Sequence, residues 1–287
     1  MNLRLWQRCA VVLLTFFLSA CGLVRTGYDN FDTLAYWWMD RYLDFNESQK
    51  REVKASLKSW HAWHRSTQLS AHADLLAELQ QMAKADVSPP AACDAIMKAR
   101  DQFETLVLQT APQAASIALL LEPANLKRLR KKFAQEDKEW REKWLDISAK
   151  QLAEDRLEEW SDRSEFFYGR LSAAQKQAIR DAISRSALDP RISWVLRQRR
   201  QDDILATLEK IRKTKPSPAM AEAEVRALME RVLHPEDPAG AEMRRDLVNE
   251  ACANSAAMHK LTTPAQRKRA EEKLAGLEQD FRRLAAR

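Results

Sequence analysis

The 287-residue chain contains only 5 glycines, and this scarcity restricts its fold more than any other feature of the sequence. Glycine adopts positive φ at the least cost, and both tight hairpin turns and phosphate-binding loops need such positions. A hairpin-rich β fold, a Rossmann fold and a P-loop are therefore disfavoured. Hydrophobic residues make up 45% of the chain, which is enough to bury a substantial core. We expect an all-α protein, built as an irregular multi-helix bundle.

A long stretch without proline or glycine predicts the element around which this bundle is organised. Residues 125–168 contain neither, and their apolar side chains recur at spacings of mostly three and four. One central helix over about 125–168 would be roughly 60 Å long at ~1.5 Å per residue. A break near Asp155 is the alternative.

The N-terminal residues have the organisation of an export signal. Arg4 and Arg8 precede an apolar run from about Cys9 to Leu18, and the small pair Ser19-Ala20 stands before Cys21. The apolar run is about half of the ~20 residues that span a bilayer. The sequence Leu18-Ser19-Ala20-Cys21 looks like a bacterial lipobox, so we expect cleavage of residues 1–20 and acylation of Cys21, as by palmitate. An ordinary cleaved signal with a free Cys21 is the alternative.

The residue after Cys21 bears on location. It is Gly22 and not the aspartate that resembles an inner-membrane retention signal. We therefore expect a lipid-anchored protein on the periplasmic face of the outer membrane, with residues 21–27 as the tether. The membrane would be a partner through Cys21, and no nucleic acid is expected there. The formal net charge of +6 includes two arginines of the signal and is too small to name a partner.

Two cysteines remain for an oxidising compartment once the signal is removed and Cys21 is acylated. They are Cys93 and Cys252, and we expect them to form a disulfide. Two separately buried free thiols are the alternative. A disulfide here would join the last third of the chain to the first.

An aromatic and acidic stretch runs from Tyr28 to Asp44. Phe31, Leu34, Trp38 and Tyr42 recur at helical spacing and predict one aromatic face. The polar face is rich in aspartate, whereas helices that lie on membranes are usually rich in lysine and arginine. We expect this helix to pack on the body of the protein, with membrane-surface binding as the alternative.

Three helix starts repeat one capping pattern, in which a polar N-cap residue precedes glutamine by three positions. They are Asn46 with Gln49, Ser172 with Gln175 and Thr263 with Gln266. An internal repeat and generic helix capping explain the pattern equally well. Helix starts of similar sequence occur in periplasmic stress chaperones, and that similarity covers only these few residues.

Prolines mark further boundaries. Ser88-Pro89 and Asp189-Pro190 predict N-caps followed by proline at the first helical position. We expect a linker over 213–218 and a turn over 235–240. Residues 28–287 would form one helical domain, with a C-terminal subdomain from about 216 as an open alternative.

The segment from Trp60 to Arg65 concentrates side chains that can bind ligands. His61 and His64 lie three residues apart and share one helix face, which is a spacing for metal ligation. No third ligand completes a site, since His72 lies two turns further on. We expect packing, with ligand contact by Trp60, His61, Trp63 and His64 as the alternative.

Five cations crowd the first turns of the predicted central helix, where the helix dipole disfavours positive charge. They are Lys127, Arg128, Arg130, Lys131 and Lys132. This conflict is typical of a binding patch, and acidic lipid headgroups or lipopolysaccharide phosphates are the partners that the compartment offers. A solvated face balanced by nearby acidic residues is the alternative.

The lipobox, the aromatic stretch ending in Trp37-Trp38-Met39-Asp40-Arg41-Tyr42, the Gln49 helix start and Trp63-His64-Arg65 together resemble a family of bacterial helical lipoproteins of unknown function. The similarity extends over most of the mature chain, and its motifs lie in the first quarter. The resemblance implies an exported, lipid-anchored, mainly helical protein, and it implies no catalytic residue.

No motif of a known enzyme class is present: the sequence lacks Gly-x-Ser-x-Gly, a P-loop and a metal-binding motif. We expect no cofactor and a function in binding, as an envelope scaffold or partner-recognition lipoprotein. A chaperone-like holder of unfolded envelope proteins is the second hypothesis. A hydrolase of unrecognised type is the third.

Overall fold

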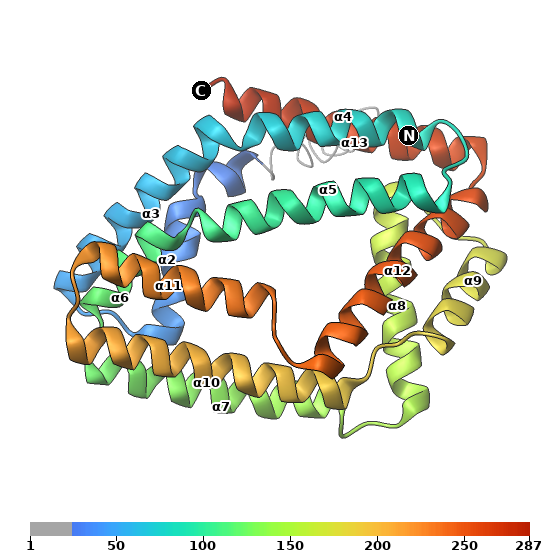
Figure 1. The fold of residues 1–287 in the computed structure, drawn as a ribbon. Helices are drawn as coiled ribbons and strands as arrows, with labels where there is room; N and C mark the ends of the chain where they lie inside the picture. Colours follow the sequence, from blue (N-terminus) through green and yellow to red (C-terminus); the bar gives the residue numbers. More distant parts are fainter. Residues whose placement is uncertain (1–24) are drawn as a thin grey trace, which may run out of the picture.

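The computed structural model describes residues 25–287, and within this range the chain forms twelve α-helices and no β-strand (Figure 1). The all-α prediction is confirmed. The helices are α2 (Phe31–Leu43), α3 (Glu47–Thr67), α4 (Leu69–Ala83), α5 (Pro89–Leu108), α6 (Ala111–Leu120), α7 (Pro123–Trp144), α8 (Ala149–Tyr168), α9 (Ala173–Ser184), α10 (Pro190–Thr214), α11 (Pro218–Leu233), α12 (Pro238–Lys260) and α13 (Pro264–Ala285). The predicted signal and the lipidated Cys21 lie outside the described residues.

The helices build two lobes that exchange their middle helices. The first lobe consists of α2, α3, α6 and α7, onto which α10 and α11 pack from later in the chain. The second lobe consists of α8, α9, α12 and α13, onto which α4 and α5 pack from earlier in the chain. In Figure 1 a half-turn about an axis between α5 and α11 relates the two lobes. The order α2 to α7 is therefore repeated as α8 to α13, and the three helices after residue 216 each pack on a helix of the first half.

The helix starts of the first lobe are locked together by two buried amides. Gln49 Nε2 donates to the carbonyl oxygen of Leu120 (2.7 Å) and to Asn125 Oδ1 (2.9 Å). Asn125 Nδ2 donates in return to the carbonyl oxygen of Leu43 (2.7 Å), just before the start of α3. Gln49 and Asn125 are each the third residue of their own helix. Each donates a hydrogen bond to a backbone carbonyl of the segment that leads into the other helix. Both starts are fixed relative to one another because the buried polar groups have no water to replace these bonds.

The second lobe repeats this lock at the starts of α9 and α13. Gln175 Nε2 donates to the carbonyl oxygen of Leu261 (3.1 Å) and to Gln266 Oε1 (2.8 Å). Gln266 Nε2 donates to the carbonyl oxygen of Arg170 (3.1 Å). The capping boxes predicted at Asn46, Ser172 and Thr263 are all present. The glutamines of these boxes also hydrogen-bond between helices. They join the starts of α3 and α7 in the first lobe and the starts of α9 and α13 in the second.

The prediction of one long central helix over 125–168 is wrong. α7 ends at Trp144, and α8 begins at Ala149 after a short turn. Ser148 caps α8, because its hydroxyl accepts a hydrogen bond from the backbone N–H of Gln151 at 3.1 Å. The break lies seven residues before Asp155. Ser148 precedes Gln151 by three residues, which is the spacing of the other capped helix starts. The sequence therefore did contain a helix-start signal within this stretch, although it has no proline or glycine.

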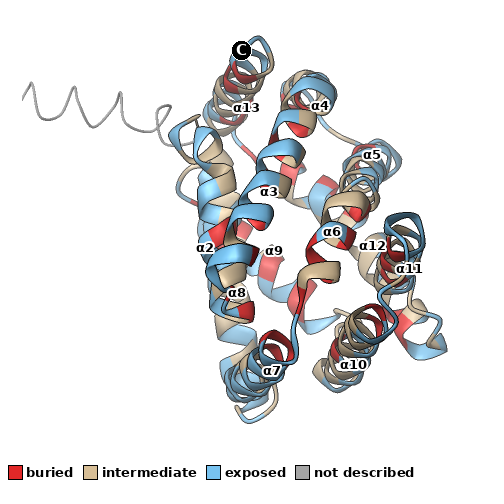
Figure 2. Ribbon diagram, turned by 90° about the vertical axis from the view of Figure 1, so that its left-hand side faces the viewer, coloured by how far each residue is buried: buried red, intermediate tan, exposed pale blue. Residues whose placement is uncertain are grey.

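α2 packs on α3 and α7 as expected, but the aromatic face predicted from the spacing is not the face that packs. The buried residues of α2 are Tyr36 and Leu43, whereas Leu34 and Trp38 are exposed. The cause lies in the turn that follows, where the ring of Phe45 stacks on Tyr36 with centroids 6.2 Å apart. Figure 2 shows that buried positions gather on the sides of the helices that face their neighbours, and α2 presents much of its length to solvent.

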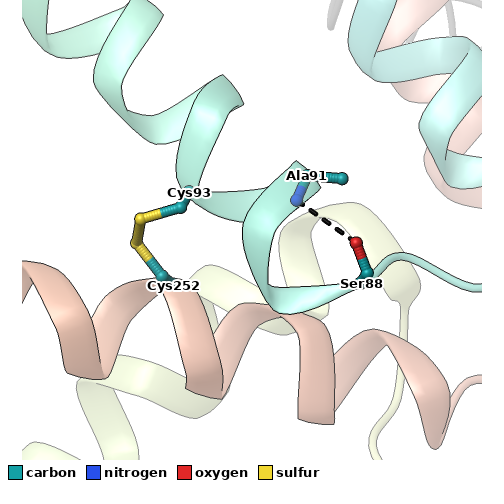
Figure 3. The surroundings of a disulfide bond; sticks show 4 residues. All are labelled: Ser88, Ala91, Cys93 and Cys252. Carbon is teal, nitrogen blue, oxygen red and sulfur yellow. Dashed lines mark hydrogen bonds between the residues drawn. A yellow bond between two sulfur atoms is a disulfide. The ribbon is translucent and has the colours of Figure 1, made fainter.

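The expected disulfide between Cys93 and Cys252 is present and joins α5 to α12 in the second lobe (Figure 3). It links positions separated by 159 residues in sequence. The start of α5 is capped as predicted, since the Ser88 hydroxyl accepts a hydrogen bond from the backbone N–H of Ala91 (3.3 Å). The disulfide thus fixes an exchanged helix to the lobe on which it packs.

Candidate binding cleft

A cleft of about 490 Å³ opens between α8, α9 and α12 in the second lobe. Its walls are mainly apolar, and its volume falls in the range of pockets that hold small ligands or the anchoring side chains of a partner. The lining residues include Trp160, Ser164 and Phe167 of α8, Ile179 and Ala182 of α9, and Ala251, Ser255 and Met258 of α12. The cleft is therefore built by three helices of one lobe.

Local structure positions these three helices. Gly169 ends α8 with φ 72°, a left-handed conformation that L side chains rarely adopt. The chain can then turn sharply into the capped start of α9 at Ser172. The lock between Gln175 and Gln266 holds this turn against the end of α12. Small residues such as Ala182 and Ala251 face the space that remains, so the helices meet without filling it.

A second, smaller cavity of about 240 Å³ lies next to the cleft between α4, α5, α8, α12 and α13. Phe167, Tyr168 and Ser255 line both cavities. These shared residues form the partition between them.

The partition is held by a buried histidine. His259 Nε2 lies 2.9 Å from the carbonyl oxygen of Ala85, and His259 Nδ1 lies 3.0 Å from the Tyr168 hydroxyl. Burial lowers the pKa of His259 and raises the pKa of Tyr168, so both are neutral near pH 7. Because a carbonyl oxygen only accepts, Nε2 carries the proton, and Nδ1 accepts the Tyr168 hydroxyl hydrogen. The pair orients the Tyr168 ring beside the cleft without adding a charge.

The rim of the cleft carries more positive than negative charge. Arg163 and Arg185 lie at its edge together with a single carboxylate, Asp181. Arg163 is only loosely paired, with its guanidinium nitrogen 4.0 Å from a carboxylate oxygen of Glu159. An acidic group on a bound molecule would meet two arginines at this edge. The cleft therefore suits a bound molecule that has an apolar body and an acidic group on one side.

The tryptophan and histidine cluster predicted from sequence lies in the first lobe, away from this cleft. His61 and His64 are buried, and Tyr28 packs on both, with ring centroids 4.6 Å from His61 and 5.7 Å from His64. The Tyr28 hydroxyl lies 2.7 Å from His64 Nδ1. Burial lowers the pKa of His64 to about 4, so it is neutral near pH 7. The cluster attaches the segment that precedes α2 to α3.

Packing also accounts for the two tryptophans of this cluster. Trp60 and Trp63 are half-buried, and the Trp60 ring stacks on His64 with centroids 5.1 Å apart. Within residues 25–287 no group of three or more side chains has the geometry to hold a metal ion. Ligand contact at this cluster stays a prediction.

Three of the five predicted patch cations line one small pocket. Arg128, Lys131 and Lys132 of α7 meet Arg41 of α2 around a space of about 250 Å³. Lys127 and Arg130 are exposed on the same helix and do not line this pocket. Sequence spacing could place the α7 cations on one helix, but Arg41 joins them only through the packing of α2 on α7.

The cleft itself was not predicted from sequence. Trp160, Ser164 and Phe167 follow one helical stripe, which looks like an ordinary core face. Ala251 and Ser255 belong to a helix of mixed composition. The available signal was the small size of the residues on α9 and α12, and small residues alone do not distinguish close packing from an open space.

Comparisons with known proteins define the family of the chain. No curated protein and no solved structure matches it. In the described part of the chain, no helix is both long and apolar enough to cross a membrane. Residues 41–237, more than half of the sequence, match the model of a family of unknown function (DUF6279). This region runs from the end of α2 to the turn after α11 and includes α8 and α9 of the cleft. The chain belongs to the family of unknown function DUF6279.

Proposed function

We propose that this protein is a lipid-anchored binding protein of the bacterial envelope, and that its cleft between α8, α9 and α12 holds an amphipathic segment of a partner protein. The cleft carries this proposal. It offers about 490 Å³ between three helices, which is the setting in which an apolar helix face docks into a groove. The tether at Cys21 and the periplasmic face of the outer membrane remain part of the proposal, supported by the sequence of the signal.

The chemistry of the cleft defines the partner segment. Apolar walls from Phe167 and Met258 would take the apolar side chains of the segment, whose burial supplies most of the affinity. Arg163 and Arg185 would pair with acidic residues beside those side chains, which favours one orientation. The occupant is therefore a segment with apolar anchors and an acidic flank.

A photo-crosslinking amino acid placed at Ala178 tests this proposal in cells. Ala178 is half-buried and lines the cleft, whereas the control position Met220 is exposed on α11, outside the cleft. One dominant envelope protein crosslinked from Ala178 and absent from the Met220 control is the expected result. A Cys21→Ala variant run in parallel reports whether capture needs the proposed anchor.

Binding of the captured partner in purified form then tests the chemistry. The double variant Arg163→Glu/Arg185→Glu should weaken binding by about tenfold or more, since each rim charge pair is reversed. Arg51→Glu/Arg191→Glu, which makes the same change of charge at two exposed arginines that do not line the cleft, is the matched control. Equal affinities for both variants would contradict the proposed role of the rim.

Two other functions would give different outcomes. A broad set of unrelated clients crosslinked from Ala178 would favour a chaperone-like holder, for which the adjoining 240 Å³ cavity provides additional apolar space. Turnover of a cell-wall substrate by the purified protein would favour a hydrolase.

A further inference from the structure

The outward side of α2 exposes three large apolar side chains in one stripe. Leu34, Trp37 and Trp38 are 56%, 64% and 59% exposed, respectively. They lie at helical spacings of three and four, so they share one face of the helix. Single exposed apolar residues are common, whereas two adjacent tryptophans beside a leucine mark an interaction surface.

This stripe leads directly into the basic pocket between α2 and α7. Arg41 follows Trp38 by three residues and lines the pocket together with Arg128, Lys131 and Lys132. Tyr42 connects the two regions, because its ring centroid lies 4.8 Å from that of Trp38 and 5.7 Å from the Lys132 ammonium nitrogen. Tryptophans and cations therefore form one continuous surface.

The cations of this pocket are poorly neutralised by the protein. Lys132 has a carboxylate of Glu136 at 3.8 Å, but Glu136 also accepts the hydroxyl of Tyr42 and lies 3.7 Å from Arg197. Within residues 25–287, no carboxylate oxygen lies within 4.0 Å of a side-chain nitrogen of Arg41, Arg128 or Lys131. The pocket thus has room for an anion and charges that are free to pair with it.

We propose that the outward side of α2 and the adjoining basic pocket form a docking surface for an anionic phospholipid bilayer. Tryptophan is enriched at the membrane interface because its ring is apolar and its N–H is polar. Clustered lysine and arginine bind anionic lipid headgroups. Trp37 and Trp38 insert among the headgroups, and the pocket of about 250 Å³ takes a lipid phosphate.

The surface fits a bilayer better than a protein partner. The tryptophans project from the outside of a helix and do not line a groove, whereas protein segments dock into grooves such as the cleft. α2 begins ten residues after Cys21, so an anchor there would hold α2 within about 35 Å of the membrane. This last argument rests on the proposed lipid anchor, and the chemistry of the surface is independent of it. The surface is also separate from the cleft.

Fluorescence quenching on vesicles tests the proposal with the full chain. The chain is reconstituted in vesicles of phosphatidylcholine, with or without phosphatidylglycerol, that contain brominated lipids as a quencher of tryptophan emission. We expect quenching to rise when phosphatidylglycerol is present and to fall again in high salt. The double variant Trp37→Phe/Trp38→Phe should lose most of this rise, although six other tryptophans remain once residues 1–20, which contain Trp6, are cleaved.

A charge-matched pair of variants tests the pocket. Arg128→Gln/Lys131→Gln removes two cations that line it, and Lys127→Gln/Arg130→Gln removes two exposed cations of the same helix that do not. The first should lose most of the response to phosphatidylglycerol, and the second should keep it. All four positions are exposed, so the fold should be unaffected.

Two results would overturn the proposal. One is quenching in the tryptophan variant equal to that of the wild type. The other is an equal loss in both charge variants, which would indicate a diffuse attraction in place of a headgroup pocket. Crosslinking from Ala178 reports on the cleft alone, so a failure of this proposal is distinguishable from a failure of the proposed function.

Discussion

In the first lobe Tyr36, Phe45 and Val53 are buried in one core with Ile117, whereas in the second lobe the space between α8, α9 and α12 is the open cleft. These regions correspond under the half-turn seen in Figure 1, and both lobes use the same lock between two helix starts. The difference therefore arises from side-chain size and helix length. α3 has 21 residues and α9 has 12, so the second lobe has less helix with which to cover its core.

The hydrogen bonds between helix starts thus fix how the helices are arranged in both lobes. The size of the side chains then decides whether the space between the helices is filled, as in the first lobe, or stays open, as in the second. The filled lobe carries the exposed tryptophans and the basic pocket on its outside. The open lobe carries the disulfide and the cleft. The two proposed binding sites, one on a surface and one in a cleft, thus lie in different halves of one repeated architecture.

Removal of the disulfide should have the largest effect and should affect the second lobe more. Cys93→Ala/Cys252→Ala releases a constraint across 159 residues, and we expect a loss of about 3–5 kcal/mol in the free energy of unfolding. Guanidinium chloride denaturation measures the total. Hydrogen exchange should show a larger loss of protection in α5 and α12 than in α6 and α11. Equal losses would contradict the division into lobes.

Disruption of the locks should have the next largest effect. Asn125→Leu leaves the Leu43 carbonyl and the backbone N–H of Glu122 without their partner, and we expect destabilisation by about 3 kcal/mol. Gln266→Leu in the second lobe should cost about 1–2 kcal/mol, because Gln266 is half-buried and water can replace part of its bonding. Urea denaturation of both variants compares them. A larger cost for Gln266→Leu would show that the open lobe depends more on its lock.

Enlarging an alanine in each lobe distinguishes filled from open space. Ala115 on α6 is buried against α10 and α11, so Ala115→Leu should overpack the first lobe and cost about 2–3 kcal/mol. Ala251 lines the cleft, and Ala251→Leu should change stability by less than about 0.5 kcal/mol. Thermal unfolding measures both. A comparable loss for Ala251→Leu would show that the cleft has no spare volume in solution.

Acid should destabilise the first lobe through His64. Unfolded histidine binds a proton below about pH 6.5, whereas burial holds the pKa of His64 in the folded protein at about 4. The unfolded state therefore binds more protons between these values, and stability falls as the pH falls through this window, by roughly 2 kcal/mol at pH 5. His64→Asn should reduce this slope.

His259→Asn provides the same comparison for the second lobe. Burial also lowers the pKa of His259, so its replacement should reduce the acid slope in the same direction. Denaturation midpoints between pH 7.5 and 4.5 give both slopes. Unchanged slopes in the two variants would show that other groups govern the acid sensitivity.

Much of the fold was predictable because local signals were strong. Scarce glycine predicted the helical class, and the capping pairs at Asn46, Ser172 and Thr263 placed three helix starts correctly. The expected loss of the other two thiols, by signal cleavage and acylation, predicted the bond between Cys93 and Cys252. The break at Ser148 was missed because periodic apolar residues continue on both sides of it, and periodicity cannot show that two helices change direction.

The sequence by itself determined the helical class, the positions of most helix starts, the cysteine pair and the family, because each depends on local chemistry or on the composition of the whole chain. Tertiary structure alone decided the exchange of helices between lobes, the outward direction of Trp37 and Trp38, the addition of Arg41 to the α7 cations and the open space beside Phe167. These features depend on which helices pack together across long separations in sequence. The spacing of side chains along one helix does not indicate which other helix will pack against it.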